Sequence, residues 1–71
     1  MPERFKATKA RRVLSALERI GWTVVKITGS HEKLARPGWP NVIFAYHDDE
    51  EIGPRILSQI AKETGLKPDD L

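Results

Sequence analysis

The 71-residue chain contains no cysteine. Disulfide bonds and thiolate metal sites are therefore excluded, and a reducing compartment, the cytoplasm, is predicted. No run of residues approaches the ~20 apolar positions of a membrane-spanning helix, so no membrane partner is expected. Residues 1–6 have no apolar stretch behind them, and this start does not have the pattern of a secretion signal.

The chain also lacks a glycine-rich phosphate loop and has only two histidines. Its length predicts a single domain over residues 1–71. A domain this small buries only roughly 60% of its unfolded surface, which leaves no room for a deep enclosed cavity. We therefore expect no bound cofactor. A shallow site that acts on a polymer lying across one face of the molecule remains compatible with this size.

Charge is distributed unevenly along the chain. Residues 1–40 carry nine Lys and Arg against three Glu, whereas residues 41–71 carry three basic residues against seven acidic ones. A concentrated basic half favours a polyanionic partner such as nucleic acid. The alternative is an ordinary solvated surface of mixed charge.

Two amphipathic helices are predicted near the ends of the chain. The first has Thr8 as its N-cap and stops at Gly21, and the second begins at Gly53-Pro54 and ends at Gly65. Each has apolar residues at three- and four-residue steps, which places them on one buried stripe. The two predicted stripes are Ala10, Val13, Leu14, Leu17 and Ile20 in the first helix, and Ile56, Leu57, Ile60, Ala61 and Thr64 in the second.

Three strands are predicted between the helices, over residues 22–27, 31–36 and 41–46. The connections are short turns, which imply an antiparallel meander. The predicted fold is therefore α+β, in the order α-β-β-β-α, with both helices on one face of a three-stranded sheet. The opposite face is left for a partner. We expect Trp22 in the core and Trp39 over the edge of the core.

The tripeptide Gly29-Ser30-His31 lies between the first two predicted strands. The glycine permits a tight turn, which places His31 at the exposed start of a strand. Lys33 lies two residues further along and projects from the same face. Pairing of the second and third strands is expected to place His31 opposite Tyr46 or His47, so that both imidazoles lie at one end of the sheet.

A histidine beside a cation suits the cleavage of RNA. A base must take the proton of the 2′-hydroxyl, an acid must protonate the leaving oxygen, and a cation stabilises the charge that develops on the phosphate. The alternative is two surface histidines without a task. The acidic run 48–51 is expected to be a solvated loop, and no metal site is predicted.

The same features, taken in order, resemble the HicA (YcfA-like) family of bacterial toxins. The resemblance covers roughly residues 7–67. It comprises the basic helix closing in Gly21-Trp22, the strand 23–27, the Gly29-Ser30-His31 signature with Leu34 three residues on, His47 after the third strand, Glu51-Ile52-x-Pro54, and a last helix ending in Gly65-Leu66.

This resemblance implies a fold like that of double-stranded-RNA-binding domains and the toxin of a type II toxin–antitoxin pair. It implies an endoribonuclease that cleaves mRNA without a metal, with His31 as the catalytic residue and a HicB-type antitoxin as partner. The predicted substrate-binding residues are Ser30, Lys33, Lys9, Arg11, Arg12, Arg36 and His47. Two other readings stay open: a non-catalytic RNA-binding module of the same fold, and a protein-interaction domain whose basic face serves an acidic partner.

Overall fold

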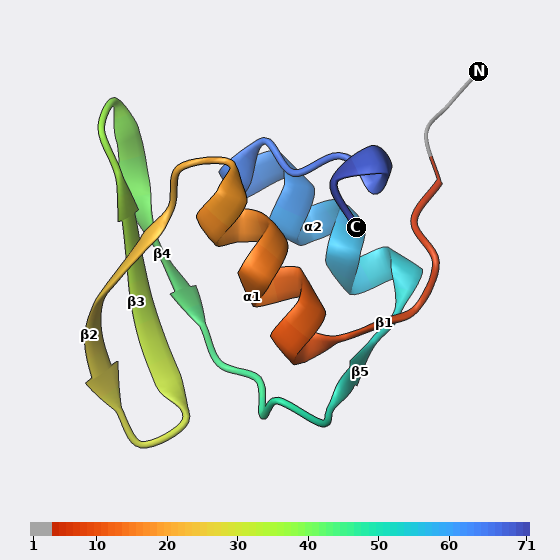
Figure 1. Cartoon of the computed structure of the whole chain (residues 1–71), viewed down its shortest axis with the longest axis horizontal. Coiled ribbons are helices and arrows are strands. Elements are labelled where there is room, and N and C mark those ends of the chain that lie inside the picture. Colours follow the sequence, from red (N-terminus) through yellow and green to blue (C-terminus); the bar gives the residue numbers. More distant parts are fainter. Residues whose placement is uncertain (1–3) are drawn as a thin grey trace.

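The computed structural model describes residues 4–71 and has two layers, a sheet and a pair of helices (Figure 1). The three longer strands form one antiparallel sheet in the order β2-β3-β4. This arrangement confirms the predicted α+β fold, which is like that of double-stranded-RNA-binding domains. The elements are β1 (Thr8–Lys9), α1 (Ala10–Arg19), β2 (Thr23–Thr28), β3 (His31–Arg36), β4 (Trp39–Phe44), β5 (Glu51–Ile52), α2 (Pro54–Thr64) and a 3-10 turn, η1 (Pro68–Asp70).

The core lies between the two helices and the sheet face that they cover. The buried side chains from these elements are Ala10, Val13, Ala16 and Leu17 of α1, Leu34, Val42 and Phe44 of the sheet, and Leu57, Ile60 and Thr64 of α2. The predicted stripe of the first helix is confirmed, with Leu14 and Ile20 packed against this core. In the second helix the prediction for Ile56 is wrong, since its side chain is 40% exposed.

The start of α1 is capped by main-chain groups of the acidic loop, so the prediction of Thr8 as N-cap is wrong. Thr8 lies in β1, which pairs with β5, a small sheet that the sequence did not predict. The N–H groups of Ala10 and Arg11 donate to the carbonyl oxygens of Glu50 (2.8 Å) and Asp48 (3.2 Å). These bonds satisfy two of the four helical N–H groups that lack an intrahelical partner.

Trp22 and Trp39 both lie at the end of α2, and they take the predicted positions, Trp22 in the core and Trp39 over its edge. Trp22 is buried, and its indole N–H donates to the carbonyl oxygen of Thr64 (3.0 Å). Trp39 packs edge-to-face against Trp22, with 5.9 Å between ring centroids, and covers the edge of the core. Gly65 ends α2 in the left-handed conformation, as predicted.

The pairing of β3 with β4 differs from the prediction. The two strands are joined by Pro37 and Gly38 alone, and Glu32 pairs with Phe44. Continuing this register places His31 level with Ala45. The prediction that His31 lies opposite Tyr46 or His47 is therefore wrong. A proline followed by a glycine at φ +84° is the pattern of a type II turn. Type II turns splay hairpin strands, and the ladder here has an irregularity between Leu34 and Arg36.

Candidate functional site

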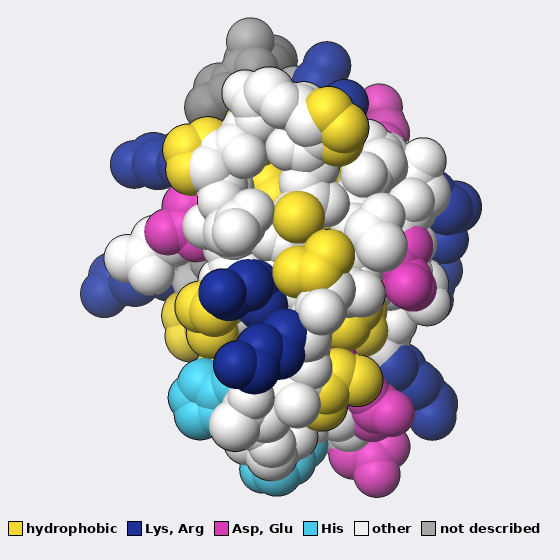
Figure 2. All heavy atoms as spheres, turned by 90° about the vertical axis from the view of Figure 1, so that its left-hand side faces the viewer, with side chains coloured by type: hydrophobic (Ala, Val, Ile, Leu, Met, Phe, Trp, Pro, Cys, Tyr) yellow, Lys and Arg dark blue, Asp and Glu magenta, His cyan; other side chains and the backbone are white. Residues whose placement is uncertain are grey.

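The sheet face that points away from the helices carries the predicted catalytic histidine. Along β3, Leu34 is buried against the helices, whereas His31 and Lys33 are exposed. Because side chains alternate along a strand, these two residues share the outer face. Figure 2 shows this face: basic side chains lie next to each other at its centre beside hydrophobic ones, and both histidines lie towards its lower end.

His31 is held by a tight hairpin turn. Thr28 and His31 are direct partners in the ladder of β2 and β3, and only Gly29 and Ser30 connect them. Gly29 has φ +60° while Ser30 does not have a positive φ, the pattern of a type II′ turn, whose twist matches that of the strands. The imidazole is therefore presented to solvent from the first residue of a regular strand, with Ser30 beside it in the turn.

A second lysine, Lys26, faces Lys33 across the ladder, and the sequence did not indicate it. The pairs Val24–Leu34 and Lys26–Lys33 follow each other with one extra residue, Val25, in β2. Simple alternation from the inward-facing Val24 would turn Lys26 inward. The bulge at Val25 reverses this and places Lys26 on the outer face beside Lys33.

His47 lies at the same end of the molecule as His31 but belongs to the loop after β4. Its backbone N–H donates to the Glu50 carboxylate (Oε1, 3.3 Å), and its carbonyl oxygen accepts from the Glu50 N–H (2.9 Å). The acidic loop is thus a closed turn that carries His47 and caps α1. The side chain of His47 is exposed.

The basic residues of α1 do not share the outer face with His31, because α1 packs on the opposite face of the sheet. Lys9 donates to the carbonyl oxygen of Asp49 (Nζ–O, 3.1 Å), and Arg11 forms an exposed ion pair with the Asp49 carboxylate (3.9 Å). Arg12 is exposed and has no such partner among the described residues. Two of the three predicted RNA contacts in this segment therefore already have an internal partner.

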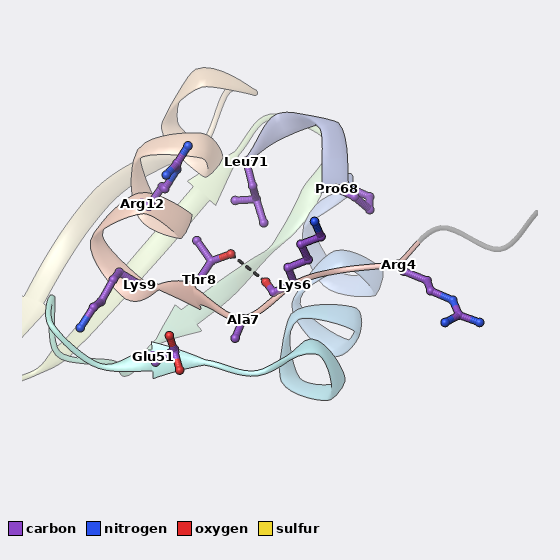
Figure 3. A pocket seen from close by; sticks show the side chains of 9 residues that line it. All are labelled: Arg4, Lys6, Ala7, Thr8, Lys9, Arg12, Glu51, Pro68 and Leu71. Carbon is purple, nitrogen blue, oxygen red and sulfur yellow. Dashed lines mark hydrogen bonds between the residues drawn. The ribbon is translucent and has the colours of Figure 1, made fainter.

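A cavity of about 480 Å³ opens beside Arg12, between the N-terminal segment and the C-terminal turn. Its basic lining residues are Arg4, Lys6, Lys9 and Arg12. Figure 3 shows Arg4 and Lys9 pointing in opposite directions and Lys6 pointing towards Pro68 and Leu71. These cations do not converge on one point, so the cavity is a basic surface rather than a formed anion site.

Arg36 lies on the inner side of the sheet, away from His31. Its guanidinium carbon stands 5.2 Å from the centroid of the Trp39 ring, and its side chain runs close to Gly21. Cation–π contact of this kind stabilises the packing of an aromatic ring. Arg36 therefore has a packing role. Its side chain is half-buried, and only the exposed part can contact a ligand.

Within residues 4–71, no three or more His, Asp or Glu side chains lie together as a metal site would need. No helix in that range has the length and apolar character needed to cross a membrane. The expectations of a metal-free reaction and of no cofactor remain predictions.

The outer face can offer an extended ligand one imidazole and two primary amines. All three groups are exposed, and two of them lie directly opposite each other. An imidazole transfers protons near neutral pH, and lysine amines bind phosphate oxygens. The open shape admits a polymer strand and does not enclose a small molecule.

A family model described as HicA toxin of bacterial toxin–antitoxin matches residues 10–66, which is most of the chain. Comparison with curated proteins and with solved structures gives no significant match.

Proposed function

The chain belongs to the HicA family, toxins of bacterial toxin–antitoxin pairs, and we propose that it is a metal-independent endoribonuclease that cleaves mRNA. In this proposal it acts in the cytoplasm and is held inactive by a HicB-type antitoxin. The observation that carries the proposal is the placement of His31. It stands on a regular strand, exposed, on a sheet face that no other element covers in the described part of the chain.

The proposed chemistry is general acid–base catalysis on a phosphodiester. His31 takes the proton of the 2′-hydroxyl, the 2′-oxygen attacks the phosphorus, and the bond from phosphorus to the 5′-oxygen breaks. The leaving 5′-oxygen takes up a proton from water, and the products are a cyclic phosphate and a 5′-hydroxyl. Lys33, on the same face, stabilises the negative charge on the phosphate oxygens. Ser30 and His47, at the same end of the molecule, are proposed to contact the substrate.

The test is the variant His31→Ala in an RNA cleavage assay that contains EDTA. Because the side chain is exposed, its loss leaves no core cavity, and the thermal midpoint of unfolding should not change. Cleavage should fall by about 10²–10⁴-fold, the usual contribution of one acid–base group. Gln59→Ala, an exposed change on α2, is the matched control and should cleave normally.

One outcome would favour the alternative of a non-catalytic RNA-binding module. If folded His31→Ala protein cleaves RNA as well as the unchanged protein, His31 is not catalytic. If neither protein cleaves RNA but both bind it, the binding module explains the data. The basic residues of α1 lie on a second side of the molecule, and this placement supports the alternative of an RNA-binding module.

A further inference from the structure

The pair formed by Lys26 and Lys33 has an unusual arrangement for a stable sheet. The two residues are direct partners in an antiparallel ladder and lie on the same face. Directly opposite residues have Cβ atoms about 4.5–5.5 Å apart, and like charges at that separation destabilise the sheet. The bulge at Val25 creates this pairing, because it turns Lys26 to the outer face.

No acidic side chain forms an ion pair with Lys26 or Lys33 within residues 4–71. The one ion pair in that range joins Arg11 to Asp49, on the other side of the sheet. Neither lysine amine donates a hydrogen bond within the described part of the chain, where the bonds from charged side chains come from Lys9 and Arg19. Two unneutralised cations held side by side form a site for an anion from outside the chain.

We propose that Lys26 and Lys33 together bind one phosphate of the RNA backbone and position the strand for His31. His31 lies two residues from Lys33 on the same face, about 7 Å along the strand, within the span of a nucleotide backbone and the flexible lysine side chains. The inference deepens the proposed function and rests on it. Lys26 acts by positioning, since it holds the substrate and takes no part in proton transfer.

An RNA strand fits this surface better than an acidic protein segment. Lys33 and His31 follow one line along β3, as successive backbone groups of a polymer would need, and Lys26 lies beside Lys33 on β2. Val25 and Ile43, which are 55% and 53% exposed, add apolar contact area near the lysines for sugars and bases. The binding test below distinguishes RNA from an acidic protein as the preferred ligand.

The experiment measures binding of a 2′-O-methyl RNA oligonucleotide, which cannot be cleaved because its 2′-hydroxyl is blocked. Lys26→Gln and Lys33→Gln should each weaken binding about tenfold or more, since charge-assisted hydrogen bonds are among the strong ones. The double variant should lose less than the product of the two single losses, because both lysines hold one phosphate. Lys62→Gln on α2 is the matched control and should bind normally.

Two further measurements separate a binding role from a structural one. Each lysine removed should reduce the slope of log affinity against log salt by about 0.7. Lys26→Gln should leave the thermal midpoint unchanged or raise it, because it relieves a repulsion. Lys26→Arg, which keeps the charge, should retain most of the affinity.

The outcomes distinguish this inference from the proposed nuclease function. If Lys26→Gln binds RNA as well as the unchanged protein and His31→Ala loses cleavage, the inference is overturned and the proposed nuclease function is supported. Weaker binding by Lys26→Gln alongside full cleavage by His31→Ala would support phosphate binding by the lysine pair, but it would remove His31 as catalyst and overturn the positioning of the strand for His31. If the unchanged protein binds an acidic peptide but no RNA, both the inference and the nuclease function fail.

Discussion

The contact between Gly65 and Trp39 leads to a prediction of unequal cost for two glycine substitutions. Gly65 and Gly29 both have a left-handed backbone, with φ +78° and +60°. A Cβ at Gly29 would meet no atom within 4 Å, whereas a Cβ at Gly65 would lie 3.0 Å from Cη2 of Trp39. Gly29→Ala therefore measures the backbone strain alone. Gly65→Ala adds the displacement of a tryptophan.

The two costs follow from the contacts that each substitution disturbs. A left-handed alanine costs roughly 1–2 kcal/mol, partly offset because alanine restricts the unfolded chain more than glycine. For Gly29→Ala we expect about 1 kcal/mol. Moving Trp39 also weakens its edge-to-face contact with Trp22, about 0.5–1.5 kcal/mol, and its cation–π contact with Arg36, about 0.5–1 kcal/mol. The total for Gly65→Ala is about 2–3.5 kcal/mol.

The assay is thermal unfolding followed by tryptophan fluorescence, because Trp22 and Trp39 are the only tryptophans and both lie in this cluster. In a domain of this size 1 kcal/mol shifts the midpoint by about 4–8 °C, so Gly29→Ala should lower it by about that amount and Gly65→Ala by roughly twice as much or more. In a Trp39→Leu background the extra cost of Gly65→Ala should disappear. Equal midpoints for the two alanine variants would refute this account of the cluster.

Two further predictions concern the partners. Arg12→Gln should weaken RNA binding more than Arg11→Gln, because Arg11 already has Asp49 as a partner, and salt titrations that give equal slopes for both would contradict this. The antitoxin should cover the outer face, so that amide hydrogens of residues 29–36 exchange more slowly in the complex. Slower exchange confined to residues 48–51 would instead indicate inhibition from a distance.

The helices were the most predictable part of the fold, because their signals are local. Apolar spacing at three and four residues identified the buried faces, Pro54 marked the start of α2, and Gly65 marked its end. Ile56 was misassigned because it lies at the border of the apolar stripe, where a small core cannot cover every apolar side chain. The order of the strands followed from the short turns.

The register of the strands could not be predicted, because it depends on single-residue irregularities. Val25 is β-branched and is an ordinary strand residue by composition, yet it forms the bulge in β2. The turn that joins β3 and β4 consists of Pro37 and Gly38 alone. The strand β4 therefore starts at Trp39, two residues before the predicted start at residue 41. One residue of shift turns every following side chain to the other face. That is why Lys26 was missed and the partner of His31 was misplaced.

The acidic loop at residues 48–51 partly offsets the excess positive charge of residues 1–40. This loop does more than remain solvated: main-chain carbonyls of Asp48 and Glu50 cap α1, and Asp49 contacts Lys9 and Arg11. Negative charge near a helix N-terminus is also favourable to the helix dipole. The excess positive charge of residues 1–40 is thereby partly neutralised at α1, on the helix side of the sheet.

Part of the positive charge that has no acidic partner lies on the outer face of the sheet. Lys26 and Lys33 face each other there, and His31 shares that face. A cross-strand repulsion is retained at this one place, whereas the basic groups at the start of α1 contact the acidic loop. In the proposed function, RNA bound on the outer face would remove this repulsion and reach the imidazole in the same step, so that the energy of binding and the position for catalysis would come from one surface.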